Sequence, residues 1–159
     1  MKAIVMAAGK GVRMKSDLPK VLHRIDGKPM LWHVVQRLLE LAAEEIYIIV
    51  GHRYDLVEKE MYREPVHFVR QKEQLGTADA VRACESELKG YEGDVLVLSG
   101  DVPLITLKTL NLLMDKHKKA GADATLLITS VKNPAGYVRI LQDDKGAVLR
   151  IVEEKDAAD

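Results

Sequence analysis

With 159 residues, of which 47% are hydrophobic, the chain has the size of one ordinary domain and enough apolar side chains for a buried core. Its 24 Lys and Arg residues balance its 24 Asp and Glu residues, which argues against a protein held on nucleic acid or an anionic membrane by its overall charge. A single cysteine, Cys84, excludes an internal disulfide and a zinc site built only from cysteines. No hydrophobic run has the length of a signal peptide or a membrane span, so we expect a cytoplasmic protein.

Short hydrophobic runs predict β-strands along the first two thirds of the chain. They are rich in β-branched residues and bounded by charge or glycine, and they occupy residues 3–7, 45–50, 66–69 and 94–99. Their hydrophobicity is nearly continuous rather than alternating, which is typical of strands covered on both faces of a parallel sheet.

Segments of helical periodicity separate these runs. We predict helices over residues 29–42, 77–88 and 106–121. The first has Pro29 at its start, and the other two begin at Thr77 and Thr106, which we expect to cap them. Strand and helix in alternation predict βαβ units with right-handed crossovers.

The last third of the chain has a different pattern. After Gly121, three β-rich segments at residues 124–131, 136–142 and 146–154 follow one another with turn signals and no helix between them. We predict an α/β protein with a mostly parallel sheet in a Rossmann-like three-layer sandwich and an antiparallel β extension at its C-terminal end. One nucleotide-binding domain is expected over residues 1–159.

A glycine-rich basic loop follows the first predicted strand. From Lys10 to Lys28 there are six Lys and Arg residues against two Asp residues, a local net charge of +4 in a neutral protein. The spacing excludes a Walker A loop and the dinucleotide Gly-x-Gly-x-x-Gly fingerprint, because Met14 stands where each needs a glycine. A loop at the carboxyl end of a parallel strand is where such sheets bind ligands, so we interpret it as an anion site. A solvated basic loop is the alternative.

Asp101 follows the predicted strand at residues 94–99 and a glycine. Its carboxylate should therefore emerge at the same sheet edge as the basic loop. A carboxylate beside a polyanion is unfavourable unless a divalent cation lies between them, and Mg²⁺ is the natural candidate. The alternative is an ordinary turn residue.

Five segments together resemble the uridyltransferase domain of bacterial bifunctional N-acetylglucosamine-1-phosphate uridyltransferases. They read MAAGKGVRMKSDLPKVLHRIDGKPML, RQKEQLGTADAV, LSGDVPLI, NPAGYVRI and IVEEKDAA. The resemblance implies the nucleotide-diphospho-sugar transferase fold. It also implies that UTP and N-acetylglucosamine 1-phosphate are joined to give pyrophosphate and UDP-N-acetylglucosamine, a peptidoglycan precursor.

The same resemblance assigns roles to single residues. It places the uridine near Ala7, Ala8 and Gly9, and the phosphates near Gly11, Arg13 and Lys20. It makes Asp101 the magnesium ligand. Uracil is read at Gln71, Gly76 and Thr77, and the sugar lies against Gly136 and Glu153. No protein nucleophile is needed, because a sugar-phosphate oxygen is already anionic at neutral pH and catalysis is positioning plus charge neutralisation.

Two residues depart from the family pattern. Val12 stands where a threonine is usual, and Val138 stands where a glycine is usual. Family members also continue beyond the position of Asp159 and supply further sugar and metal contacts there, so these 159 residues are expected to bind nucleotide better than they turn it over. Two alternatives stay open: a nucleotide-binding module without catalysis, and a nucleotidyltransferase that uses another base or sugar phosphate.

Overall fold

The computed structural model describes residues 1–9, 11, 14–73 and 76–152. The chain divides into two compact units, residues 1–111 and 112–159, each with its own fold. A single domain over residues 1–159 stays a prediction.

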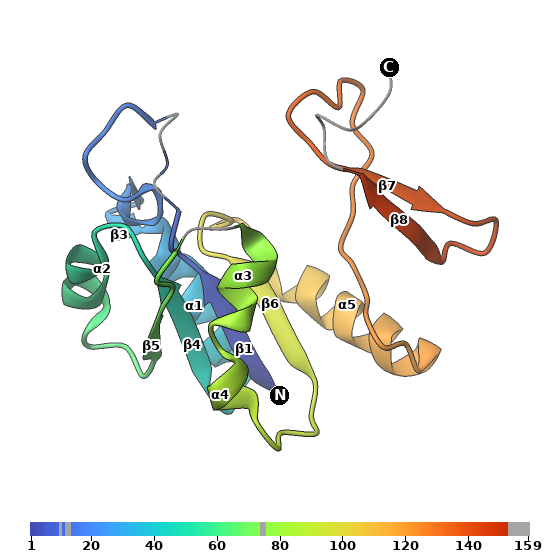
Figure 1. The fold of residues 1–159 in the computed structure, drawn as a ribbon, viewed down its shortest axis with the longest axis horizontal. Helices are drawn as coiled ribbons and strands as arrows, with labels where there is room; N and C mark the ends of the chain where they lie inside the picture. Colours follow the sequence, from blue (N-terminus) through green and yellow to red (C-terminus); the bar gives the residue numbers. More distant parts are fainter. Residues whose placement is uncertain (10, 12–13, 74–75, 153–159) are drawn as a thin grey trace. The chain divides into compact units, whose positions relative to one another are not determined.

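Unit 1 is built on a four-stranded parallel sheet in the order β5-β4-β1-β6 (Figure 1). Its strands are β1 (Lys2–Met6), β4 (Ile46–Val50), β5 (His67–Arg70) and β6 (Val95–Ser99). Every neighbouring pair is parallel, with Val5 opposite Ile48 on one side and Leu98 on the other. The predicted parallel α/β fold is confirmed, and each strand lies within a residue of its predicted bounds.

The two central strands carry the core of unit 1. All five residues of β4 are buried, and so are the three middle residues of β1, as their continuous hydrophobicity predicted. β6 lies at the edge of the sheet and alternates instead, with Val95 and Val97 more than one third exposed. Successive side chains of a strand point to opposite faces of the sheet, so the face of β6 that carries Val95 and Val97 is the less completely covered one.

Helices lie on both faces of the sheet (Figure 1). On one face, Ala80 of α3 (Thr77–Arg82) and Cys84 pack against Ile4, Tyr47 and Ile49 in a single buried cluster. On the other face lies α1 (Met30–Glu40), whose buried residues are Leu31, Val34, Val35 and Leu38. The spacing of these four residues follows the helical period, so one stripe of α1 is removed from water.

The predicted helix over residues 77–88 is wrong in detail, because it forms two short helices. These are α3 (Thr77–Arg82) and α4 (Glu85–Leu88). The Ala83 N–H is shared between the carbonyl oxygens of Asp79 and Ala80, and the Cys84 N–H donates to the Val81 carbonyl oxygen three residues back, so the helix tightens into a turn at this point. Thr77 is the first helical residue rather than the cap, which is Gly76. The sequence analysis did not predict α2 (Tyr54–Met61), whose buried residues are Val57 and Met61.

The C-terminal part of the basic loop forms a 3₁₀ helix and a short hairpin. The 3₁₀ helix η2 (Lys20–Leu22) leads into β2 (Arg24–Ile25), which pairs with β3 (Lys28–Pro29). Asp26 and Gly27 form the turn with φ angles of 50° and 75°, the left-handed conformation that an Asp-Gly turn adopts in tight hairpins. This hairpin was not predicted, although the Asp-Gly pair is its sequence signal.

The helix α5 (Leu107–Ala120) begins in unit 1 and ends in unit 2. Thr106 caps it as predicted, because its hydroxyl oxygen accepts the N–H of Thr109 at 3.2 Å.

In unit 2, β7 (Arg139–Gln142) pairs antiparallel with β8 (Val148–Val152), which confirms part of the predicted extension. The strand predicted over residues 124–131 is wrong, because this segment has no ladder partner among the described residues. Its hydrophobic pattern alone does not supply the hydrogen bonds of a strand.

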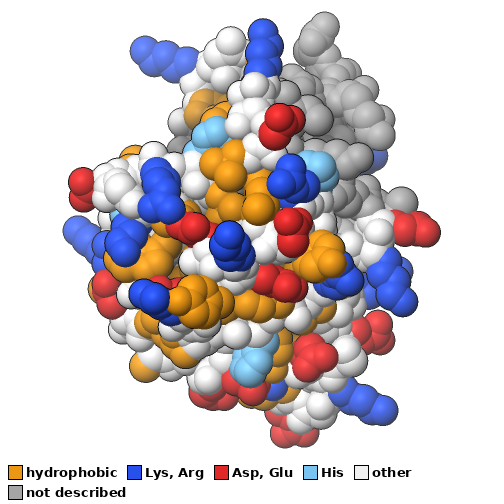
Figure 2. Space-filling model, turned by 90° about the vertical axis from the view of Figure 1, so that its left-hand side faces the viewer, with side chains coloured by type: hydrophobic (Ala, Val, Ile, Leu, Met, Phe, Trp, Pro, Cys, Tyr) orange, Lys and Arg blue, Asp and Glu red, His pale blue; other side chains and the backbone are white. Residues whose placement is uncertain are grey.

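The surface carries charges of both signs. Figure 2 shows Lys and Arg side chains interspersed with Asp and Glu side chains, and hydrophobic groups between them, over one face of the molecule. This mixture agrees with the balanced composition, so any strong electrostatic attraction to a ligand must come from a local cluster.

Candidate functional site

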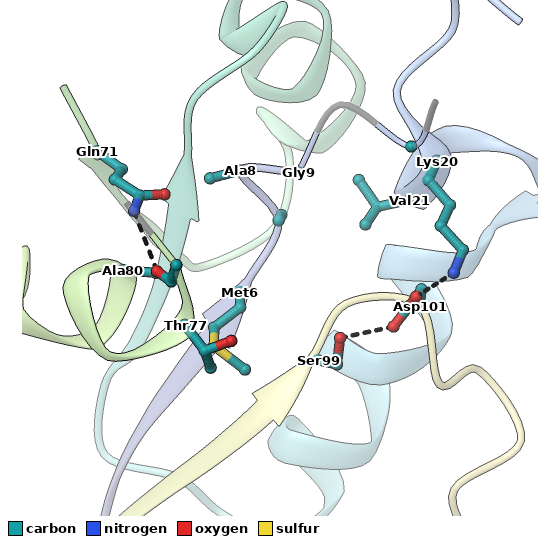
Figure 3. A pocket seen from close by; sticks show the side chains of 13 residues that line it. Met6, Ala8, Gly9, Lys20, Val21, Gln71, Thr77, Ala80, Ser99 and Asp101 are labelled. Atoms are coloured by element: carbon teal, nitrogen blue, oxygen red, sulfur yellow. Dashed lines mark hydrogen bonds and ion pairs between the residues drawn. The ribbon is translucent and has the colours of Figure 1, made fainter. Parts of the chain in front are cut away.

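A pocket of about 300 Å³ opens at the carboxyl edge of the unit 1 sheet (Figure 3). Open parallel sheets bind ligands at this edge, where several strands end and their connecting loops meet. The lining residues come from the ends of β1, β5 and β6, from η2 and from the start of α3: Met6, Ala7, Ala8, Gly9, Gly11, Lys20, Val21, Gln71, Gly76, Thr77, Ala80, Ser99 and Asp101.

The start of the basic loop forms the floor of the pocket. Ala7 is buried and extends the ladder beyond β1, because its N–H donates to the Ile49 carbonyl oxygen at 2.9 Å. Gly11 has φ of +60°, and a Cβ atom built on it would stand 2.8 Å from the Cβ of Lys20. Any other residue at Gly11 would therefore be strained and would clash, so this glycine lets the loop fold closely over Lys20.

Lys20 and Asp101 form an ion pair at one end of the pocket. The Nζ atom of Lys20 lies 2.5 Å from Oδ2 of Asp101, and the Ser99 hydroxyl donates to Oδ1 of Asp101 at 2.6 Å (Figure 3). Gly100 permits this arrangement, because a Cβ at that position would lie 3.1 Å from Leu31, from Val21 and from the Met6 carbonyl oxygen. Both carboxylate oxygens of Asp101 are therefore held within the protein.

The environment of Asp101 favours its charged form. Partial burial raises the pKa of its carboxyl group, but the hydrogen bonds from Lys20 and Ser99 outweigh burial, so the pKa lies below its ordinary value. The carboxylate is thus ionised at neutral pH, as a cation ligand must be.

Gln71 lies at the opposite end of the pocket and is only 8% exposed. Its backbone N–H donates to the Val50 carbonyl oxygen at 2.9 Å, which places the residue directly after β5. Its side-chain Nε2 donates to Oδ2 of Asp79 at 2.8 Å and to the Gly76 carbonyl oxygen at 3.4 Å. Figure 3 shows the side-chain oxygen turned toward Ala8.

Most of the site residues predicted from the sequence line this one pocket, although their roles stay predictions. The residues brought together are Ala7, Ala8, Gly9, Gly11, Lys20, Gln71, Gly76, Thr77 and Asp101. Arg13 and Glu153 lie outside the described residues, as does Val12. Gly136 belongs to unit 2, where its φ is +83°, and Val138 of the same unit is 45% exposed.

Sequence reasoning missed two polar residues of the site, Ser99 and Asp79. Ser99 stands two residues before Asp101, which is the spacing that puts side chains on one side of an extended chain, so the pair could have been noticed. Asp79 carries no comparable signal, because its contact with Gln71 depends on how α3 packs against the sheet.

The described residues contain no group of three or more His, Cys, Asp or Glu side chains placed to hold a metal ion. Asp101 therefore offers one carboxylate and no protein cage. Mg²⁺ is commonly bound in this way, through one or two carboxylates with substrate phosphates and water completing its octahedron. The donor set at Asp101 fits such an ion.

The sequence matches the MobA-like NTP transferase domain family over residues 3–153. It is 47% identical over 159 residues to the bifunctional protein GlmU of Syntrophomonas wolfei, covering 100% of this chain and 35% of that protein. The chain thus spans about one third of the length of this curated relative.

Two solved structures share the fold. HddC from Yersinia pseudotuberculosis, complexed with GMP-PN, has a TM-score of 0.70 at 22% identity. The alignment covers 96% of this chain and 68% of the HddC chain. Rv0371c from Mycobacterium tuberculosis, in complex with manganese, has a TM-score of 0.61 at 17% identity and covers 75% of this chain and 59% of its own. Within the described part of this chain, no helix has the length and apolar character that crossing a membrane requires.

Proposed function

Because this chain belongs to the MobA-like NTP transferase domain family, we propose that it transfers UMP from UTP to N-acetylglucosamine 1-phosphate, giving UDP-N-acetylglucosamine and pyrophosphate. Membership of the family indicates nucleotidyl transfer. The identity of the base and of the sugar phosphate is what we propose here. The observation that carries it is one pocket with an amide oxygen at one end and a Lys–Asp pair at the other. Such a pocket offers a base-reading group and a phosphate-binding group to the same ligand.

In this proposal the nucleotide lies along the pocket. Uracil lies at the Gln71 end, beside Gly76 and Thr77, and the triphosphate lies at the Lys20 end. Ala7, Ala8 and Gly9 lie under the ribose, where small residues leave room for it. Figure 3 supports this direction, because Ala8 and Gly9 stand between Gln71 and Lys20.

The remaining predicted residues keep the roles that the resemblance implies. Gly11 and Arg13 belong to the phosphate end, since both lie in the basic loop. Gly136 and Glu153 contact the sugar. A cytoplasmic location belongs to the same proposal, because nucleoside triphosphates are available there.

The proposed reaction uses no protein nucleophile. A phosphate oxygen of the sugar phosphate forms a bond to the α-phosphorus of UTP. The bond from that phosphorus to the oxygen bridging to the β-phosphate breaks, and its electron pair leaves with pyrophosphate. Lys20 stabilises the negative charge on the triphosphate, and the floor of the pocket holds the α-phosphorus in line.

Asp101 would hold Mg²⁺ in this site, with Ser99 orienting its carboxylate through the 2.6 Å hydrogen bond. When bound, Mg²⁺ neutralises phosphate charge. Lys20 must then leave Asp101 and move to the phosphates. The Lys20 side chain is 40% exposed and the Asp101 side chain is 25% exposed, so the pair is only partly buried, and the phosphates and Mg²⁺ would replace the two charges as partners.

The test has two stages. Calorimetric titration of the parent chain with UTP, CTP, GTP and ATP in Mg²⁺ should show a preference for UTP. A coupled assay for pyrophosphate should then show release from UTP that depends on N-acetylglucosamine 1-phosphate and falls in Asp101→Asn. Absence of UTP binding would refute the proposal.

Other results of the same test point to the alternatives. UTP binding without pyrophosphate release would support a binding module. A preference for GTP would support guanylyl transfer. GTP is included because HddC is complexed with GMP-PN and guanine also carries a ring N–H beside a carbonyl.

A further inference from the structure

Asp79 lies outside the pocket lining but contacts the residue that we propose to read the base. Its Oδ2 accepts a hydrogen bond from Nε2 of Gln71 at 2.8 Å. We propose that Asp79 is a positioning residue that fixes which end of the Gln71 amide faces the pocket, and that it thereby selects bases with a ring N–H donor. This inference rests on the proposed function, because it assumes that a base lies beside Gln71.

The surroundings of the Gln71 amide permit one orientation. Its Nε2 faces two oxygens, one from the Asp79 carboxylate at 2.8 Å and one from the Gly76 carbonyl at 3.4 Å. A primary amide has two N–H donors, so both are used inside the protein. An amide turned by half a rotation would place Oε1 against the same two oxygens, and two hydrogen bonds would become two repulsions. Gln71 is 8% exposed, so water does little to compensate.

The fixed orientation leaves only the Oε1 acceptor for a ligand. Figure 3 shows this oxygen pointing toward Ala8, on the side of the pocket, while the nitrogen points toward the start of α3. Uracil has an N3–H donor that can meet this acceptor. Cytosine has a lone pair at N3 and would place an acceptor against an acceptor. The arrangement therefore favours UTP over CTP, two ligands with the same triphosphate.

Of the two oxygens, the Asp79 carboxylate contributes more to the orientation. A charged acceptor makes a hydrogen bond roughly twice as strong as a neutral one, and the Asp79 contact is also the shorter. Without it, Gln71 keeps only the long contact to Gly76 and can turn its nitrogen toward a cytosine. A purely structural role for Asp79 in the first turn of α3 would instead lower the stability of the fold and leave base preference unchanged.

The experiment compares four forms of the full chain: the parent, Asp79→Ala, Asp79→Asn and Glu85→Ala. Each is titrated calorimetrically with UTP and with CTP in Mg²⁺, and its thermal unfolding is followed by circular dichroism. Glu85→Ala is the matched control, because Glu85 is an exposed acidic residue at the start of α4. Loss of a buried hydrogen-bonded partner typically changes affinity by roughly five- to a hundredfold.

We expect the ratio of UTP to CTP affinity to fall about tenfold or more in Asp79→Ala. Asp79→Asn should keep most of the ratio, because its side-chain oxygen can still accept from Gln71. Glu85→Ala should match the parent. An unchanged ratio in Asp79→Ala would overturn the inference, as would equal loss of the ratio in Asp79→Asn. A parent that binds UTP and CTP equally well would also overturn it while leaving nucleotide binding intact, whereas a parent that binds no nucleotide would refute the proposed function itself.

Discussion

The substitution Asp101→Asn should tighten the binding of UTP in the absence of metal, although it removes a proposed metal ligand. The Asp101 carboxylate lies 2.5 Å from the Lys20 ammonium group, so the positive charge that would bind a phosphate is already paired. A phosphate in contact with Lys20 would lie within about 5 Å of the Asp101 carboxylate, since charge-assisted contacts are about 2.8 Å long. Asparagine removes this repulsion and releases Lys20.

The magnitude follows from the position of the pair. Two like charges about 5 Å apart repel by roughly 0.8 kcal/mol in water and by roughly 3 kcal/mol near a protein surface. The Asp101 side chain is 25% exposed, which places it between these limits. About 1 to 2 kcal/mol is a reasonable value and corresponds to roughly five- to thirtyfold tighter binding.

Calorimetric titration with UTP in EDTA, and again in Mg²⁺, measures both effects. The parent should bind more tightly with Mg²⁺ than without it. Asp101→Asn should bind more tightly than the parent in EDTA and gain little from Mg²⁺. If Asp101→Asn binds metal-free UTP no better than the parent, the carboxylate does not lie beside the triphosphate and the reasoning is wrong.

The same carboxylate predicts a dependence of stability on pH. The pKa of Asp101 is lowered in the folded protein from its ordinary value of 3.8, so the folded state binds fewer protons than the unfolded state as the pH falls. The ion pair contributes fully to the free energy of unfolding at pH values above 3.8. This contribution is lost as the pH falls through the lowered pKa of the folded protein. The difference in urea midpoint between the parent and Asp101→Asn should therefore vanish in strong acid. A difference that persists there would contradict this cause.

Three further predictions concern the phosphate end, the thiol and the core. Lys20→Ala should weaken UTP binding in Mg²⁺ by roughly ten- to a hundredfold, because a charge-assisted hydrogen bond contributes about 1.5 to 3 kcal/mol. In the same titration, Lys119→Ala at the exposed end of α5 should leave the affinity for UTP unchanged. Cys84 is buried, and burial raises the pKa of its thiol to about 11, so Ellman's reagent should label it at pH 8 only after denaturation. Rapid labelling of the native chain would count against its packing role. Ile49→Ala should lower the free energy of unfolding by about 2 to 5 kcal/mol in urea titrations followed by Trp32 fluorescence, because Ile49 is fully buried in the sheet. Leu104→Ala changes a residue that is 82% exposed, so it should lower the free energy of unfolding by about 0.5 kcal/mol or less.

Local sequence patterns were sufficient to predict the parallel sheet and the edge at which the site lies. Continuous hydrophobic runs such as the one at residues 46–50 must be covered on both faces, and helical segments between them require parallel crossovers. Residues that follow such strands then meet at the carboxyl edge. For this reason the sequence alone could place Asp101 beside the loop that begins at Gly9, whereas Gln71 was assigned by the family resemblance.

Tertiary structure alone decided the pairings within the site. The sequence predicted that Asp101 emerges beside the basic loop, but it did not predict an ion pair with Lys20. That pairing follows from the adjacent positions of β1 and β6 in the strand order β5-β4-β1-β6. The orientation of Gln71 likewise depends on the packing of α3, which places a carboxylate against one end of its amide. Residues 124–131 show the same limit, because a strand-like pattern becomes a strand only where another backbone accepts its hydrogen bonds. Hydrophobic periodicity is a local property of the chain, whereas charge pairing and ladder partners are set by distances between segments that are remote in sequence.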